Sequence, residues 1–246
     1  MSPYGTIARP ASDKSLSSYL PRHATLRSSD NATLFHITIA ESISPEDSKF
    51  TLSGRAHPAL VEAMRKVFND EVLRGDTYPH ETVVDMQGFE SYFFGGDAFV
   101  LLRGDYTSAE LVPTTRTSIE EWDHDLLGFF YIKPNFPGRC SHICNGGFMV
   151  HPVHRGLGIG SILGKAFLKI VPVIGYRASM FNLVFESNVA SVKLWRRLGF
   201  KEIGRVPRAG RLRGQGANPG QEPNEGYIDA IQFYWDFESM PVPEEH

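Results

Sequence analysis

A glycine-rich turn is the part of the sequence that most clearly indicates chemistry. Residues 151–160 read His-Pro-Val-His-Arg-Gly-Leu-Gly-Ile-Gly, between an apolar run that ends near Val150 and a helical pattern. The first amides of a helix have no internal acceptors, and glycines lack the Cβ atoms that would keep a pyrophosphate from backbone N–H groups. The helix dipole and the Arg155 guanidinium add positive charge. The turn therefore predicts a bound pyrophosphate, from either a nucleotide or coenzyme A.

The glycine spacing argues against the two commonest nucleotide-binding motifs. A dinucleotide-binding turn needs G-x-G-x-x-G, and its third glycine would fall here on Ser161 or Leu163. A P-loop needs Gly-Lys followed by Ser or Thr, whereas the pair at residues 164–165 lies within the helix and is followed by alanine. The pattern that remains is R-x-x-G-x-G.

This pattern resembles the acetyl-CoA-binding motif of the GNAT acetyltransferases. Residues 188–200 are in turn similar to the family's helix N-x-x-A-x-x-L-Y-x-x-x-G-F, with Ser191 in the small-residue position and Trp195 in place of the tyrosine. The resemblance implies acetyl-CoA as co-substrate and no metal. The cofactor-binding residues that it implies are Val150, Arg155, Gly156, Leu157, Gly158, Ile159, Gly160 and Asn188.

Three further segments resemble the fungal proline-analogue N-acetyltransferases, which acetylate azetidine-2-carboxylate and related imino acids. They are residues 131–135, residues 139–142, and residues 181–185 with Asn188. Asparagines on the central strands of that family serve the substrate and cofactor pocket. The resemblance therefore implies that Asn145 and Asn182 bind the acceptor and that Asn182 and Asn188 are catalytic. The structural alternative is that each asparagine closes a strand end or caps a helix, as Asn188 is placed to do.

Acetyl transfer needs an uncharged amine and a way to stabilise or protonate the leaving thiolate. GNAT enzymes often use the helix tyrosine as the acid, but Trp195 has no phenol, so the acid is unassigned. Glu186 and His142 are candidate bases, and a water held by asparagines is the alternative.

The hydrophobic pattern predicts the elements that must position these residues. It indicates a mixed α/β arrangement in one domain over residues 32–246, and the resemblance implies that this domain is GNAT-like, an α/β fold with a mixed central sheet flanked by helices. Residues 1–31 lack apolar periodicity and are predicted to form a flexible tail. Residues 103–124 are expected to form a loop and residues 210–226 a linker. Strands are expected at residues 34–40, 98–102, 126–132, 147–150, 179–185, 200–206 and 227–234, and helices at residues 57–73 and 82–94 and from residues 159 and 188.

Composition argues against several classes of protein. The 246 residues are 41% hydrophobic and carry a formal charge of -3, without the basic excess of a nucleic-acid binder. No apolar run approaches the ~20 residues of a membrane span, so no membrane partner is expected.

Two cysteines are too few for a secreted disulfide framework, and we predict a cytoplasmic protein. Mitochondrial import directed by the basic, serine-containing amino terminus is the alternative. A zinc site from Cys140, His142 and Cys144 is disfavoured because no second compact ligand pair accompanies them.

These observations predict an enzyme that moves acetyl from acetyl-CoA to the nitrogen of a small imino or amino acid. The resemblance also implies a homodimer. Two alternatives stay open: a GNAT enzyme acting on a polyamine, an antibiotic or a protein amino terminus, and a non-catalytic acyl-CoA-binding module in which the lost tyrosine marks lost chemistry.

Overall fold

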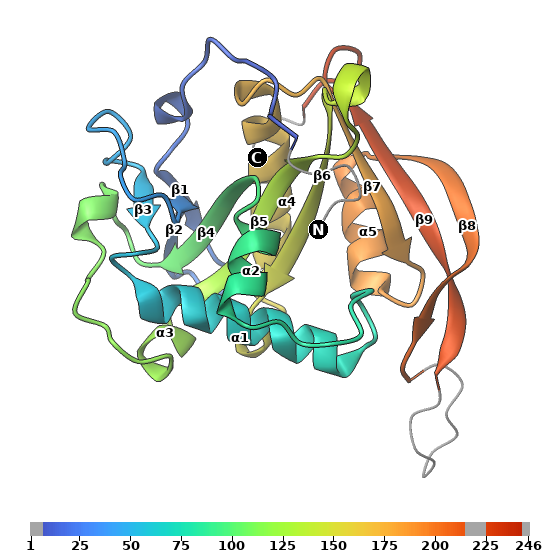
Figure 1. Ribbon diagram of the computed structural model, residues 1–246, viewed down its shortest axis with the longest axis horizontal. Coiled ribbons are helices and arrows are strands. Elements are labelled where there is room, and N and C mark those ends of the chain that lie inside the picture. The colour runs from blue at the N-terminus through green and yellow to red at the C-terminus, as the bar shows by residue number, and fades with distance from the viewer. Residues whose placement is uncertain (1–6, 215–224, 243–246) are drawn as a thin grey trace.

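A mixed sheet forms the centre of the computed structural model, which describes residues 7–214 and 225–242 (Figure 1). The strand order is β1-β2-β4-β5-β6-β7-β9-β8, and β3 lies beside β2. The β2–β3 and β6–β7 pairs are parallel, and the other neighbours are antiparallel. The predicted fold class, a mixed sheet flanked by helices, is confirmed.

The strands are β1 (Arg22–Thr25), β2 (Asn31–Thr38), β3 (Thr51–Ser53), β4 (Asp97–Arg103), β5 (Leu126–Pro134), β6 (Ile143–Val150), β7 (Ala178–Phe185), β8 (Lys201–Leu212) and β9 (Gly226–Asp236). The helices are α1 (Pro58–Arg74), α2 (Met86–Phe93), α3 (Glu120–Asp123), α4 (Ile159–Val173) and α5 (Val189–Leu198).

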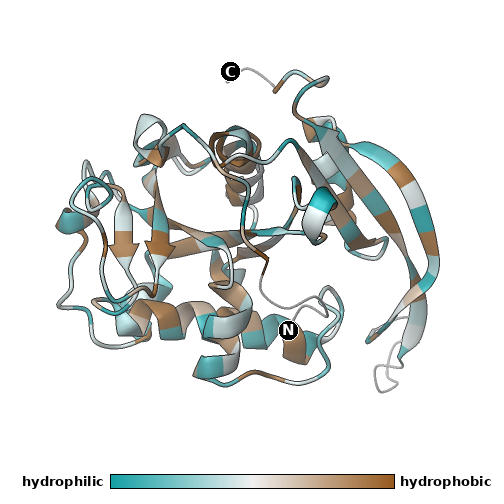
Figure 2. Ribbon diagram, turned by 45° about the horizontal axis from the view of Figure 1, so that its top comes forward, coloured by the Kyte–Doolittle hydropathy of each residue, from teal (hydrophilic) through white to brown (hydrophobic). Residues whose placement is uncertain are grey.

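Helices cover both faces of the sheet. Helices α1 and α2 bury one apolar cluster against the central strands, and α4 and α5 bury another on the opposite face. Successive β5 residues Tyr131 and Ile132 belong to different clusters, because strand side chains alternate between faces. Figure 2 shows hydrophobic residues concentrated in the central strands, whereas the outer β8–β9 hairpin alternates in hydropathy.

Local signals at the helix ends match the sequence. Asn188 accepts a hydrogen bond from the Ser191 N–H at 3.1 Å and caps α5, and Asp85 caps α2 in the same way. Gly199 ends α5 with φ +93°, in the left-handed region that glycine adopts without strain. The predicted start and end of α5 are thus confirmed.

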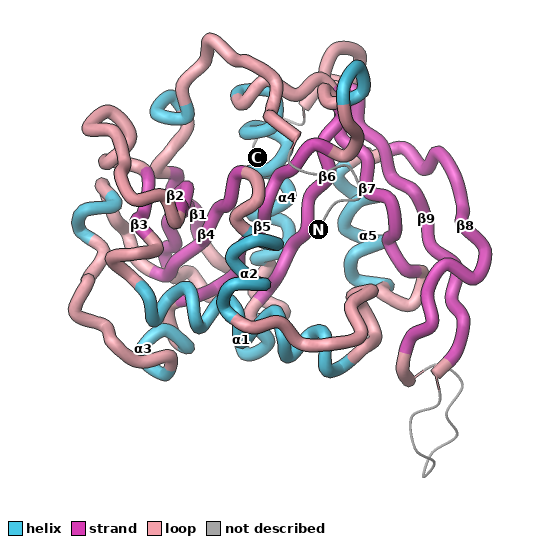
Figure 3. Tube along the Cα trace, viewed as in Figure 1, coloured by secondary structure: helices cyan, strands magenta, loops and turns pink. Residues whose placement is uncertain are grey.

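Strands β6 and β7 pair only where they begin. Ile143 lies opposite Ala178 and Cys144 opposite Ser179, and no later residues of these two fully described strands pair with each other. Beyond that point the strands separate, as Figures 1 and 3 both show. Backbone N–H and C=O groups along the two facing edges are therefore left for an extended ligand.

The predicted amino-terminal tail is wrong for its second half. Strand β1 pairs with β2, and Leu20 and Leu26 are only 4% and 3% exposed. The apolar residues of this segment, Leu20 and Leu26, are irregularly spaced and give no periodic signal. Strand β1 lies at the sheet edge and is stabilised by pairing with β2 rather than by an alternating apolar pattern. Residues 1–6 of the predicted tail lie outside the described residues.

Other boundaries also shifted. Strand β6 begins at Ile143, four residues before the predicted start, because Gly146 and Gly147 interrupt the apolar pattern without interrupting the β5 ladder. The predicted loop over residues 103–124 contains the short helix α3. Strand β8 runs to Leu212, so the predicted linker is shorter, and its residues 215–224 lie outside the described part of the chain.

Candidate acetyl-CoA and acceptor site

The glycine turn joins β6 to α4. Gly156 and Gly158 have φ of +88° and +86°, where an L side chain costs ~1–2 kcal/mol. A Cβ on Gly156 would meet no atom within 4 Å, and one on Gly158 would meet only the Arg27 side chain, at 3.4–3.6 Å. The amides of Ser161 and Ile162 are the first to donate to Gly158, so those of residues 159–160 keep no backbone acceptor among the described residues. This open, N–H-rich turn fits a pyrophosphate.

Buried side chains hold the turn in place. The His154 Nε2 lies 2.8 Å from the Asp123 carbonyl oxygen, and His151 lies 3.4 Å from the Asp123 carboxylate. Arg155 pairs with Glu71 of α1, a carboxylate whose side chain is only 7% exposed and which also accepts from Arg74 at 3.0 Å. Arg155 was expected to add positive charge for the anion. Its guanidinium instead ties the turn to α1.

A second arginine, Arg27, contacts the glycine turn. The Arg27 N–H donates to the Leu157 carbonyl at 3.2 Å, and its Nη1 lies 3.4 Å from the Gly156 carbonyl oxygen. The side chain is exposed, and no carboxylate of the described residues pairs with it. Sequence reasoning missed Arg27 because it assigned residues 1–31 to a tail, and no motif surrounds it.

Two asparagine amides meet at the head of the β6–β7 divergence. Asn182 donates to Asn135 at 2.6 Å and accepts from it at 2.9 Å, and Asn135 also lies 3.4 Å from the Met180 carbonyl oxygen. Asn182 lies in an irregularity of the β7–β9 ladder between Phe181 and Val184. This reciprocal pair was not foreseen, although Asn135 belongs to a segment of the family resemblance.

The other two predicted asparagines make local contacts. The Asn145 Oδ1 accepts from the Gly146 N–H at 2.8 Å, and Asn188 caps α5. Asn145 lies opposite Lys133 in the β5–β6 ladder, one residue past the last β6–β7 pair. The structure thus brings Asn145 and Asn182 to the same divergence, whereas Asn188 stands after the far end of β7.

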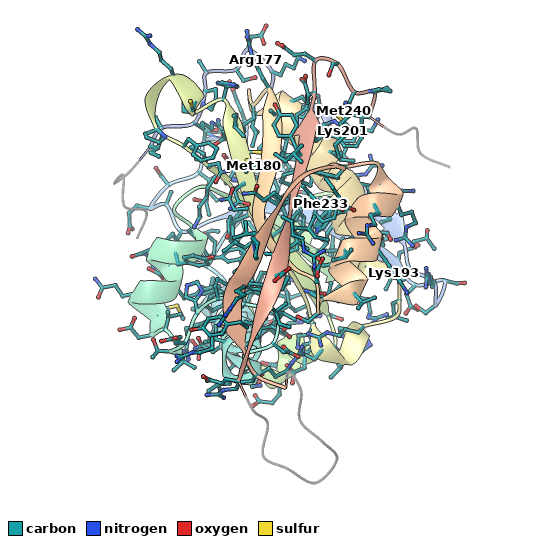
Figure 4. All side chains as sticks on the ribbon, turned by 90° about the vertical axis from the view of Figure 1, so that its right-hand side faces the viewer. Arg177, Met180, Lys193, Lys201, Phe233 and Met240 are labelled. Carbon is teal, nitrogen blue, oxygen red and sulfur yellow. The ribbon has the colours of Figure 1, made fainter. Side chains whose placement is uncertain are left out.

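These polar groups share the sheet face that α1 and α2 cover. Tyr131 belongs to the apolar cluster of α1 and α2, so Lys133 and Asn135, at alternate positions of the same chain segment, point the same way. Asn145 faces that side as the direct partner of Lys133. Figure 4, which looks onto β8 and β9, places Met180 on the side of β7 away from α5 and Lys193, and Asn182 follows at the alternate position.

Three phenols and one ammonium line this face beside Asn145. The hydroxyls of Tyr92 and Tyr131 lie 2.9 Å apart, and burial raises the pKa of Tyr92 and raises those of Tyr78 and Tyr131 well above their usual value. A side chain at Gly147 would collide with Tyr78 and Tyr131. Burial lowers the pKa of Lys133 to about 8. Tyr131 and Lys133 stand in a segment that carries the family resemblance, yet sequence reasoning gave neither them nor Tyr78 a role.

Comparisons with known proteins identify the family. The model of the acetyltransferase (GNAT) family matches residues 85–200, which include the glycine turn and α5. The chain is 40% identical to the N-acetyltransferase aca1 of Schizosaccharomyces pombe over 181 residues, which span 74% of this chain and 82% of that protein. The chain belongs to the GNAT acetyltransferase family.

Solved GNAT structures share its fold. A GCN5-related N-acetyltransferase from Kribbella flavida matches with a TM-score of 0.55 and 27% identity, over 72% of this chain and 91% of that one. A phosphinothricin acetyltransferase from Sinorhizobium meliloti, solved with acetyl-CoA, matches with a TM-score of 0.51 and 16% identity, over 75% and 88% of the two chains. The family match and the likeness to aca1 identify the protein as an N-acetyltransferase of the GNAT type. Among its described residues, no helix is long and apolar enough to cross a membrane.

The usual GNAT acid is replaced by a core residue. Trp195 is 3% exposed and packs against Phe148, Phe181 and Phe200 at ring-centroid distances of 4.8, 4.5 and 5.3 Å. Trp195 therefore fills the core between α5 and the sheet, a packing role that does not require a phenol.

The two candidate bases are already engaged. Glu186 accepts from Arg205 at 2.7 Å and lines a hollow beneath α5 with Val192 and Ile231. His142 lies 3.1 Å from the Arg139 carbonyl oxygen through its Nδ1. Among the described residues, neither side chain forms a hydrogen bond with the asparagine pair, and neither is assigned as the base.

The segment from Cys140 to Cys144 is not extended throughout. Cys140 ends a 3-10 turn (Gly138–Cys140), whereas Cys144 is buried in β6 with its pKa raised to about 12 by burial. Cys140, His142 and Cys144 therefore do not lie on one strand face, as they would in an extended segment. Within residues 7–214 and 225–242, no cluster of three or more His, Cys, Asp or Glu side chains is arranged to hold a metal.

Proposed function

We propose that this acetyltransferase moves the acetyl group of acetyl-CoA to the nitrogen of a small imino or amino acid of the azetidine-2-carboxylate or proline-analogue type. The observation that carries the proposal is the Asn135–Asn182 pair at the head of the β6–β7 divergence. A primary amide has two N–H donors and two acceptor sites, and the reciprocal pair uses one of each. Asn182 therefore retains a donor for a carboxylate and an acceptor site for a ring N–H.

The amides orient the acceptor and do not titrate. During transfer the acceptor nitrogen bonds to the acetyl carbon, the carbon–sulfur bond breaks, and the nitrogen loses one proton. Asn182 neither takes up nor releases that proton at ordinary pH, so its proposed contribution is positioning, and the proton leaves to water. Asn145 joins it on the acceptor side. For Asn188 we propose a cofactor contact in addition to its observed cap.

The cofactor half of the proposal rests on the glycine turn. Residues 156–160 would hold the pyrophosphate through backbone N–H groups, with Val150 at the end of β6 and Arg155 as the tie to α1. Bound there, acetyl-CoA supplies the activated thioester. The chain's own part is to present the acceptor nitrogen at the open edges of β6 and β7.

A panel assay tests the proposal. Free thiol released from acetyl-CoA would be followed with azetidine-2-carboxylate, cis-4-hydroxyproline, spermidine and short peptides as acceptors. We expect release with the two imino acids and far less with spermidine, because Lys133 places positive charge on the acceptor side. Release with spermidine or peptides alone would refute the acceptor class, and tight acetyl-CoA binding without any release would favour a non-catalytic module.

The homodimer and the cytoplasmic location also remain proposals drawn from the resemblance and the composition. Light scattering of the purified protein distinguishes a dimer from a monomer, and imaging of a tagged chain distinguishes cytoplasm from mitochondria.

A further inference from the structure

Lys133 is a half-buried ammonium group without a carboxylate partner. Its Nζ lies 4.2 Å from the ring centroids of both Tyr92 and Tyr131, and it donates to the Tyr92 carbonyl. No ion pair joins Lys133 to any acidic side chain of residues 7–214 and 225–242. Since buried charges are normally paired, this ammonium calls for a partner.

The contact with Tyr92 explains part of its placement. Tyr92 is near the carboxyl end of α2, where carbonyls lack intrahelical donors and a cation is favourable. That contact uses one of three ammonium N–H groups, and the faces of two rings attract the charge without accepting full hydrogen bonds. A purely structural lysine would leave two donors half-buried and unsatisfied.

The position of Lys133 indicates which anion it serves. It lies opposite Asn145 in the β5–β6 ladder. Asn135, whose amide binds Asn182, follows two residues later on the same face, ~7 Å along the chain. An anion between Lys133 and the asparagine pair would accept from the ammonium and from the remaining N–H group of Asn182. A large phosphate is less suited, because Tyr78, Tyr92 and Tyr131 crowd the same face around Gly147.

We propose that Lys133 anchors the carboxylate of the acceptor, which supplies the missing counter-charge and sets the preference for amino and imino acids over uncharged or cationic amines. The proposal rests on the proposed function, and it assigns Lys133 as a specificity-determining residue. When the carboxylate is bound there, the adjoining ring nitrogen of the acceptor faces the β6–β7 divergence.

The first test compares azetidine-2-carboxylate with azetidine-2-carboxamide in the full chain. The measured quantity is the ratio of their kcat/KM values in wild type divided by that ratio in Lys133→Met. The amine pKa difference between the two acceptors cancels, because it is the same for both enzymes. We expect a quotient of about 10 to 100, the loss of one hydrogen bond to a charged group.

Matched variants separate recognition from folding. Lys133→Arg keeps the charge and should retain more of the carboxylate preference than Lys133→Met, and Lys201→Met, an exposed lysine on β8, should leave it unchanged. An equal fall of activity with both acceptors in Lys133→Met would overturn the proposal and assign a structural or proton-transfer role. An acceptor panel in which wild type acetylates no imino acid would refute the proposed function instead.

A second measurement does not depend on turnover. The pKa of Lys133 is followed by the 13Cε shift of labelled protein, assigned by its loss in Lys133→Met, with and without N-methylproline, whose tertiary nitrogen cannot yield a stable amide. Around the ammonium, burial raises the pKa values of Tyr78, Tyr92 and Tyr131. The pKa of His80 is lowered by burial and by Lys133, and Asn145 does not titrate. The pKa of Lys133 without ligand is expected near 8, and saturating carboxylate should raise it by about 1 to 2 units. An unmoved pKa would contradict the carboxylate anchor whatever the activity.

Discussion

Gly158→Ala tests the assignment of the glycine turn. At φ +86° an alanine costs ~1–2 kcal/mol of backbone strain, and its methyl group would stand on the open side of the turn, 3.4 Å from Arg27. For a domain of this size that strain lowers the melting temperature by about 2–8 °C. If the methyl group also removes one backbone N–H bond to a phosphate, the Kd for acetyl-CoA should rise about 10- to 100-fold.

Gly199→Ala is the matched control. Gly199 has φ +93° and its Cβ would lie 3.5 Å from Trp235, so strain and crowding are similar, but it ends α5 rather than beginning α4. Thermal melts without ligand should show comparable losses for the two variants. Isothermal titration with acetyl-CoA should show weakened binding only for Gly158→Ala. Equal affinities in the two variants would refute the placement of the pyrophosphate on this turn.

Three further substitutions test other parts of the site. Asn182→Ala should raise the acceptor KM about 10-fold and leave the acetyl-CoA KM unchanged, since one hydrogen-bond donor to the acceptor is lost. If only the acetyl-CoA KM changed, Asn182 would instead be a cofactor-binding residue. Arg27→Gln should raise the acetyl-CoA KM several-fold, and more at low than at high salt, because the side chain is exposed; a salt-independent effect would exclude a phosphate contact. Trp195→Ala should cost ~3–5 kcal/mol of stability by chemical denaturation, as expected for a buried indole; a loss below ~1 kcal/mol would contradict its core role.

Long periodic segments carried the sequence prediction of the fold. Helix α4 and strand β7 follow regular apolar spacing, and α5 is bounded by an asparagine cap and a glycine, so their positions could be predicted to within a few residues. Strand β1 could not, because an edge strand of four residues is stabilised by its neighbour β2 and shows no distinctive pattern. The amino-terminal segment was consequently mistaken for a tail.

The site was predictable only where its residues follow one another in sequence. The glycine turn forms one contiguous motif and could be found without a structure. Arg27, Glu71 and Lys133 come from three separate parts of the chain, and their contacts with the turn or the acceptor face depend on how the sheet is ordered. The Asn135–Asn182 pair joins residues 47 positions apart, which no spacing rule anticipates.

The most direct test of the account is a competition experiment with 13C-labelled acetyl-CoA. The enzyme is given azetidine-2-carboxylate, azetidine-2-carboxamide, spermidine and a peptide at equal concentrations, and the labelled products are quantified by mass spectrometry. We predict N-acetylazetidine-2-carboxylate as the main labelled product, formed in proportion to the coenzyme A released. Label found mainly on spermidine or on the peptide would contradict the account.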